Sequence, residues 1–154
     1  CMGILGLVAA LFGLDQYLKQ KIENQSPDSF PRMMEGTGGM IKLYRNHNSG
    51  FCFEFLRQKP ELVRMLPVCF TSAAAGVLCF LMTKKGHRAE KAGYALIVSG
   101  ALSNLCDRLK RGYVVDYFSF QPGFLKKIVF NIGDLCIAAG AVILAARSLL
   151  GKED

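Results

Sequence analysis

Two aspartates, Asp116 and Asp134, combine a reactive side chain with an unusual setting. They lie 18 residues apart on either side of a polar and aromatic segment, and Asp134 stands near the start of an apolar stretch long enough to cross a membrane. An ionisable residue at the edge of a span is costly to place, so it is a candidate for function whose partner should be sought. Two carboxylates that share one proton can divide the work, one as general base on a water and the other as acid towards the carbonyl oxygen or leaving amine, as in aspartic proteases.

Other polar side chains occur at helical spacing near the ends of apolar stretches, where a helix places them on one face. These groups are Asp15 with Lys19, Asn104 with Asp107 and Arg108, and Asn131 with Asp134. For the first two groups, interfacial ion pairing that fixes the depth of a helix is at least as well supported as a part in catalysis. For Asp134 the alternative is helix capping, because the helix dipole favours a carboxylate in the first turn. Capping does not account for Asp116.

The apolar residues come in blocks, which is the pattern of membrane spans. The composition is 51% hydrophobic and the mean hydropathy is +0.26, both high for a soluble protein of 154 residues. Residues 62–82 and 130–150 each provide the 21 residues that a tilted helix needs to cross about 30 Å of hydrocarbon. Two weaker blocks, 2–14 and 92–106, bring the prediction to four transmembrane helices, and a start near His87 would lengthen the second of them to a full span.

The first block has an alternative, since 13 apolar residues fit the hydrophobic core of a signal peptide. It lacks a basic segment before it and an A-x-A cleavage site after it, so we expect a membrane helix. A lipid anchor on Cys1 is not expected either, because a polar tether normally follows such a cysteine.

Between the first two blocks the sequence changes character. Residues 24–39 are rich in turn formers, and residues 40–47 partly alternate apolar with polar side chains as a half-exposed strand does. Residues 114–120 favour a second extended segment. The run 36–39 lacks the Gly-Lys-Ser/Thr ending of a phosphate loop, so we interpret it as a turn. The sequence therefore predicts an α-helical membrane protein with four transmembrane helices and a small extramembrane β-rich segment, in a single domain that spans residues 1–154.

The net charge of +7 is better explained by lipid head groups than by nucleic acid, because basic residues flank the predicted spans. Four cations within residues 84–91 favour a cytoplasmic loop between the second and third spans. Five more within residues 108–127 compete by the same rule, so charge alone decides the orientation only weakly. Two histidines and six cysteines without C-x-x-C spacing support neither a zinc site nor a disulfide framework.

Five short motifs give the chain a resemblance to a known family. Asp15 with Lys19 is similar to a D-x-x-x-K motif, and residues 48–53, which include Asn48 and Gly50, are similar to N-x-G-x-x-F. Residues 100–108 resemble G-A-L-G-N-x-x-D-R, residues 112–116 resemble G-x-V-V-D, and residues 130–134 resemble F-N-x-A-D. Each motif alone is weak, but five in the right order at the right span ends are specific. Over nearly its whole length the chain resembles the lipoprotein signal peptidases (signal peptidase II), which are bacterial aspartic proteases with four transmembrane helices.

The resemblance implies an activity and a place. The chain would cleave diacylglyceryl-modified prolipoproteins before the lipidated cysteine, as a multi-pass protein of the bacterial cytoplasmic (inner) membrane, with an Asp116/Asp134 dyad that faces outward. Its partners would be these substrates and membrane lipid, without nucleic acid, and we expect a monomer that needs no metal or cofactor. The implied binding or supporting residues are Asp15, Lys19, Asn48, Gly50, Asn104, Asp107, Arg108 and Asn131.

The chain departs from the family pattern at a few positions. Ser103 stands where Gly is usual, Gly133 stands where Ala is usual, and Phe51-Cys52 replaces a pair of small residues, which predicts a narrower pocket beside Asn48. Every polar motif position is intact, so these differences bear on substrate preference more than on chemistry.

Two other classes of protein are alternatives to this interpretation. A small transport or ion-coupling protein would use the aspartates to bind cations or relay protons, but it predicts carboxylates near mid-span, whereas these lie at span ends. An inactive homologue that serves as a scaffold would be indicated by the loss of either motif aspartate, and both are present.

Overall fold

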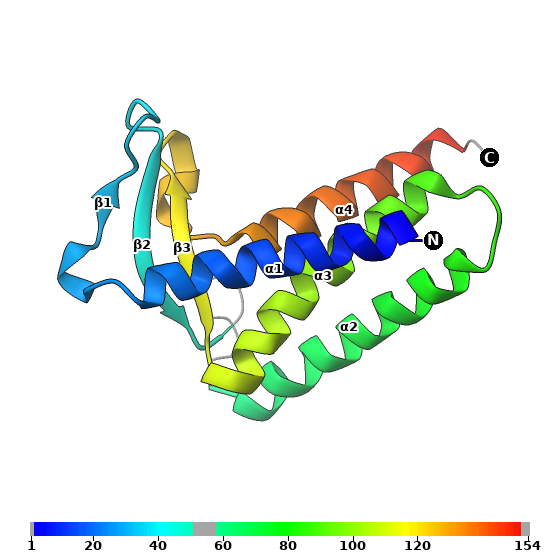
Figure 1. Ribbon diagram of the computed structural model, residues 1–154, viewed down its shortest axis with the longest axis horizontal. Coiled ribbons are helices and arrows are strands. Elements are labelled where there is room, and N and C mark those ends of the chain that lie inside the picture. The colour runs from blue at the N-terminus through cyan, green and yellow to red at the C-terminus, as the bar shows by residue number, and fades with distance from the viewer. Residues whose placement is uncertain (1, 51–57, 152–154) are drawn as a thin grey trace.

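The computed structural model describes residues 2–50 and 58–151, and within them it contains four α-helices and a three-stranded sheet. The helices are α1 (Met2–Glu23), α2 (Pro60–Met82), α3 (Arg88–Arg111) and α4 (Ile132–Leu150). Helix α3 contacts each of the other three. Figure 1 shows the sheet at one end of the helices and both chain termini, together with the turn between α2 and α3, at the other end.

Of the described helices, two are long and apolar enough to cross a membrane by length and composition. They are residues 61–82 of α2, with a mean hydropathy of 2.0, and α4, with 1.7. Only 17% of each span is buried within the protein, and α2 exposes large apolar side chains such as Phe70 and Phe80. These are the two spans that the sequence predicts most strongly.

The first and third helices run further than the apolar blocks that predict them. Helix α1 does not end at residue 14 but continues to Glu23, because Asp15 and Lys19 turn into the protein and pair there. Helix α3 begins at Arg88, as the extension towards His87 predicts, and passes residue 106 to end at Arg111. Gly112, at φ 82°, then supplies the left-handed conformation that commonly closes a helix.

The sheet consists of antiparallel strands in the order β1 (Arg32–Met33), β2 (Ile41–Asn48) and β3 (Val114–Phe120). Both β2 and β3 confirm the predicted extended segments, whereas the two-residue strand β1 lies inside the segment predicted as turns. The run 36–39 is a turn, with positive φ at three glycines. In the register of β2 and β3, Asn46 pairs with Asp116 and Asn48 with Val114, after an irregularity between Leu43 and Asn46.

Two features hold the sheet and the helices in place. A cluster of Ile22, Val115, Tyr117 and Phe118 packs the end of α1 against β3, and Phe130 joins it by pairing with Phe118. Along the contact of α3 with α4, glycines spaced by seven residues face one another, Gly93 against Gly140 and Gly100 against Gly133. A Cβ atom at Gly100 would overlap the carbonyl oxygen of Gly133. Small residues thus bring the two backbones into direct contact, as is common between membrane helices.

Candidate active site

The first turn of α4 brings the two sequence-predicted aspartates together through Asn131. Asn131 is the N-cap of α4, and its side-chain oxygen accepts a hydrogen bond of 2.9 Å from the main-chain N–H of Asp134. Asp134 returns the interaction, since its Oδ2 accepts from the main-chain N–H of Asn131 at 3.1 Å. The side-chain Nδ2 of Asn131 then donates to Asp116 Oδ1 at 2.8 Å. The helix-capping role considered for Asp134 is therefore confirmed, and the same cap links it to Asp116.

Asp116 lies in strand β3 and is 3% exposed. Its Oδ2 accepts a hydrogen bond of 3.1 Å from Asn48 Nδ2 across the strand pair, while Oδ1 accepts from Asn131. Burial, followed by the negative charge of Asp134, raises the pKa of Asp116 to about 7, against the opposing effect of these two hydrogen bonds. Asp116 can therefore hold a proton near neutral pH.

A buried ion network lies behind the aspartates. Lys19 is fully buried and pairs with Asp15 at 3.0 Å and with Asp107 at 3.1 Å. Its ammonium also donates to Asn104 Oδ1 at 2.8 Å, and Asn104 Nδ2 donates in turn to Asp134 Oδ1 at 2.9 Å. A single side chain thus connects the buried cation to one carboxylate of the candidate dyad.

These contacts correct the alternative reading of the polar pairs as interfacial ion pairs. Asp15 and Lys19 are 1% and 0% exposed, so the pair lies inside the helix bundle and not at its surface. The sequence groups Asp107 with its neighbour Arg108. In the structure Asp107 instead forms ion pairs with Lys19 and, at 3.2 Å, with Arg111. Its Oδ2 also accepts from the main-chain N–H of Val115, the residue before Asp116. Asp107 therefore helps to position strand β3.

Asp15 joins four elements at one carboxylate. Its Oδ2 accepts from Ser103 Oγ of α3 at 2.6 Å and contacts Lys19 of its own helix. Its Oδ1 accepts from the Tyr117 hydroxyl of β3 at 2.8 Å and from the main-chain N–H of Ile132 of α4 at 3.1 Å. Burial, then the Asp15 carboxylate, raises the pKa of the Tyr117 hydroxyl, which keeps it protonated as a donor.

Arg108 holds the segment that follows β2. Its Nη2 donates to the carbonyl oxygen of Gly50 at 2.8 Å, and the N–H of Gly50 donates to Asn48 Oδ1 at 3.0 Å. Arg108 and Gly50 therefore support Asn48, which reaches Asp116. Phe51 and Cys52 lie outside the described residues, so the narrower pocket that they predict stays a prediction.

All ten sequence-predicted site residues lie at this end of the bundle, but sequence reasoning missed some of their partners. Ser103 is noticed only as a departure from a motif glycine, yet its hydroxyl binds Asp15. Tyr117 is read only as part of a strand, yet its hydroxyl also binds Asp15. The available signal was a side-chain hydroxyl in a segment that is buried, because a buried hydroxyl needs a hydrogen-bond partner.

The chain is similar to known proteins over nearly its whole length. A model of the signal peptidase (SPase) II family matches residues 7–150. The lipoprotein signal peptidase of Xanthomonas axonopodis pv. citri is 31% identical over 96% of this chain and 86% of its own length. That of Sphingopyxis alaskensis is 35% identical over 94% of this chain and 84% of its own length.

The fold is also that of two solved structures, each described as a bacterial membrane enzyme. Both have a TM-score of 0.78. One is 20% identical and covers 100% of this chain and 94% of its own, and the other is 18% identical and covers 99% and 96%.

Proposed function

The chain belongs to the signal peptidase II family of aspartic-type lipoprotein signal peptidases, and from this premise we propose that it cuts diacylglyceryl-modified prolipoproteins with Asp116 and Asp134 as its catalytic dyad. The observation that carries the proposal is the double contact of Asn131, which hydrogen-bonds to both carboxylates. Such a bridge holds the two carboxylates in one site, where the negative charge of Asp134 opposes the ionisation of Asp116.

The surroundings of the two carboxylates support different roles for them. Asp134 lies in the first turn of α4 and accepts hydrogen bonds from the Asn131 N–H and from Asn104. These contacts oppose the effect of burial and favour its ionised form. Asp116, whose pKa is raised to about 7 by burial and by the charge of Asp134, favours its protonated form. Asp134 is therefore the general base and Asp116 the general acid.

These roles give a balanced hydrolysis. Asp134 takes a proton from a water whose oxygen forms a bond to the carbonyl carbon before the lipidated cysteine, while Asp116 gives its proton to the carbonyl oxygen. The tetrahedral intermediate then collapses, and its C–N bond breaks. The proton held by Asp134 passes to the leaving amine, and the hydroxyl proton of the intermediate returns to Asp116, so the dyad recovers its starting state.

The position of the dyad also suits such a substrate. We propose that all four helices cross the membrane, since the 22 residues of α1 and the 24 of α3 extend about 33 Å and 36 Å. Their charged residues Asp15, Lys19 and Asp107 face one another and not the lipid. The dyad then lies at the sheet end of the bundle, at the depth of the boundary between lipid and water. The lipid-modified cysteine of a substrate lies at the same depth, at the bilayer surface. The sheet faces outward, and the chain termini lie on the cytoplasmic side.

Incubation of the purified protein in detergent with a diacylglyceryl-modified prolipoprotein, followed by mass measurement of the products, tests the proposal. Asp116→Asn and Asp134→Asn should each abolish cleavage, and the double variant should be little worse than either, because the two act as a unit. Asp28→Asn, at an exposed aspartate of a short 3-10 helix, is the matched control and should cleave normally. Near-normal turnover in either dyad variant would overturn the proposal. Proton flux in liposomes without cleavage would favour the ion-coupling alternative.

A further inference from the structure

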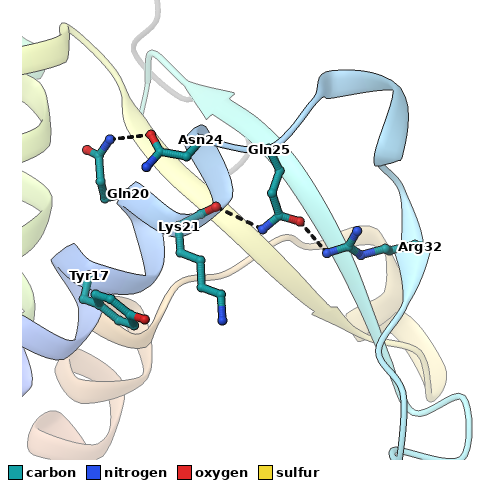
Figure 2. Close-up of a pocket in the computed structure, with 6 residues that line it drawn as sticks. All are labelled: Tyr17, Gln20, Lys21, Asn24, Gln25 and Arg32. Carbon is teal, nitrogen blue, oxygen red and sulfur yellow. Dashed lines mark hydrogen bonds between the residues drawn. The ribbon is translucent and has the colours of Figure 1, made fainter.

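A groove of about 540 Å³ opens on the surface of α1 (Figure 2). It lies between the last turns of α1 and strand β1. Its lining residues are Tyr17, Gln20, Lys21, Asn24, Gln25 and Arg32. In Figure 2 the Lys21 side chain extends into the space between the Tyr17 ring and the Arg32 side chain.

The groove is separate from the candidate active site. At 100° per residue, Tyr17 and Lys21 lie on the side of α1 opposite to Asp15 and Lys19. The latter pair is buried against α3, whereas Tyr17 is 62% exposed. A ligand in the groove would therefore face the lipid and the aqueous boundary and not the dyad.

Tyr17 places the groove at the edge of the bilayer. Residues 3–14 of α1 carry no charged side chain, and exposed Leu14 lies one turn before Tyr17. An exposed tyrosine at the end of such a stretch marks the level of the lipid head groups. Lys21 lies one further turn along the helix, about 6 Å outward, which is the level of the lipid phosphates.

The charges of the groove suit an anion. Among the residues that the structure describes, its lining contains two cations and no carboxylate, and neither the Lys21 ammonium nor the Tyr17 hydroxyl has a hydrogen-bond or ion-pair partner. Arg32 is held in place, since its guanidinium donates to Gln25 Oε1 and lies 5.0 Å from the centre of the Phe30 ring. Gln25 is fixed in turn by a hydrogen bond of 2.9 Å to the carbonyl oxygen of Lys21. A fixed guanidinium beside an unpaired ammonium is a suitable arrangement for phosphate oxygens.

We propose that this groove binds the phosphate of an anionic phospholipid from the surrounding leaflet. Lys21 and Arg32 contact the phosphate oxygens, and the Tyr17 ring lies against the glycerol and the start of an acyl chain. The occupant is a lipid because Tyr17, which lines the groove, and Leu14, one turn before it, are both exposed on the apolar part of α1 that we propose faces the membrane. Binding there holds α1 at a fixed depth relative to the lipid head groups.

The test is native mass spectrometry of the purified protein in detergent with added phosphatidylglycerol or phosphatidylcholine of the same acyl chains. The wild type should retain phosphatidylglycerol more tightly than phosphatidylcholine. The double variant Lys21→Gln with Arg32→Gln should raise the apparent Kd for phosphatidylglycerol by about 5- to 30-fold, as expected for the loss of two cations beside a lipid surface. Lys126→Gln with Lys127→Gln removes the same charge from exposed positions at the same end of the molecule and should change the Kd little.

Further variants make the result decisive. Lys21→Arg with Arg32→Lys keeps both charges and should retain most of the binding, which separates loss of the site from loss of the fold. Asp116→Asn should bind lipid like the wild type, so the outcome does not depend on the proposed catalysis. Equal losses in the two charge-neutralised variants, or equal retention of both lipids by the wild type, would overturn the proposal. Displacement of the lipid by an equal concentration of inorganic phosphate would assign the groove to free phosphate and would also overturn it.

Discussion

Replacement of Asn48 by alanine should move the alkaline limb of the cleavage rate to higher pH. Above neutrality the rate should fall as Asp116 loses its proton, with a midpoint set by its pKa of about 7. The hydrogen bond from Asn48 Nδ2 to Asp116 Oδ2, at 3.1 Å, stabilises the ionised carboxylate and so lowers this pKa. Without it the protonated form persists to higher pH, and the limb moves upward.

The size of the shift follows from the value of one hydrogen bond. A hydrogen bond to a charged group contributes about 1.5–3 kcal/mol, and one pKa unit corresponds to about 1.4 kcal/mol. A water that enters the space left by Asn48 would recover part of this contribution, so the lower end of the range applies. The alkaline limb should move up by about one pH unit, and the maximal rate should fall because Asn48 also helps to position the acid.

Cleavage of a diacylglyceryl-modified substrate between pH 5 and 10 measures the shift. Asp28→Asn, at an exposed aspartate of the short 3-10 helix, is the control and should leave both the rate and the limb in place. Arg108→Ala removes the hydrogen bond to the carbonyl oxygen of Gly50, which supports Asn48, and should lower the rate by roughly 10- to 100-fold. An alkaline limb that stays fixed or moves down in Asn48→Ala would refute the assignment of Asp116 as the acid.

Three further predictions concern the frame of the site. Lys19→Met should destabilise the folded protein by about 3–5 kcal/mol, because it leaves Asp15 and Asp107 buried without their shared cation. Thermal unfolding in detergent measures the loss, and adding Asp107→Asn should recover part of it. An unchanged melting temperature in Lys19→Met would contradict the network. Gly100→Ala should cost about 1–3 kcal/mol and reduce cleavage by forcing α3 and α4 apart, whereas Gly76→Ala, in open space on α2, should cost little; equal effects would exclude the glycine contact as their cause. In a variant without native cysteines, a cysteine at position 48 should react with an impermeant thiol reagent from outside and one at position 87 should not; the reverse result would invert the proposed orientation.

The sequence predicts α2 and α4 well because lipid imposes a simple rule. A segment in hydrocarbon must satisfy its backbone internally, so 20 apolar residues already predict a helix such as α2 or α4. The apolar block at residues 2–14 stops short of the end of α1 at Glu23 for the complementary reason. Asp15 looks like a boundary in a local window, and only its contacts with Ser103 and Tyr117, about 90 and 100 residues away, explain why the helix continues.

The candidate site is predicted as a set of residues but not as a network. Motif order places the ends of α1 and α3 and the start of α4 on one side, which is enough to bring the aspartates together. It does not indicate that Asp107 pairs with Lys19 and Arg111, because that choice depends on how the helices are rotated in the bundle. Nor does it indicate the cluster at Glu23, which binds Arg45, His47 and Tyr113 from two other parts of the chain.

The fourfold contact of Asp15 affects how genetic data on this protein should be interpreted. A change at Asp15 would break the hydrogen bonds that join α1 to the start of α4 and to β3. A genetic selection that reports only on processed lipoprotein would give this change the same score as a change at Asp116. Such a screen would therefore overcount the residues that perform the chemistry, and the excess would fall on Asp15, Lys19 and Asp107. Measuring protein abundance in parallel would separate the two groups, because variants that lose this junction should be degraded, while variants of the dyad should accumulate as intact, inactive protein.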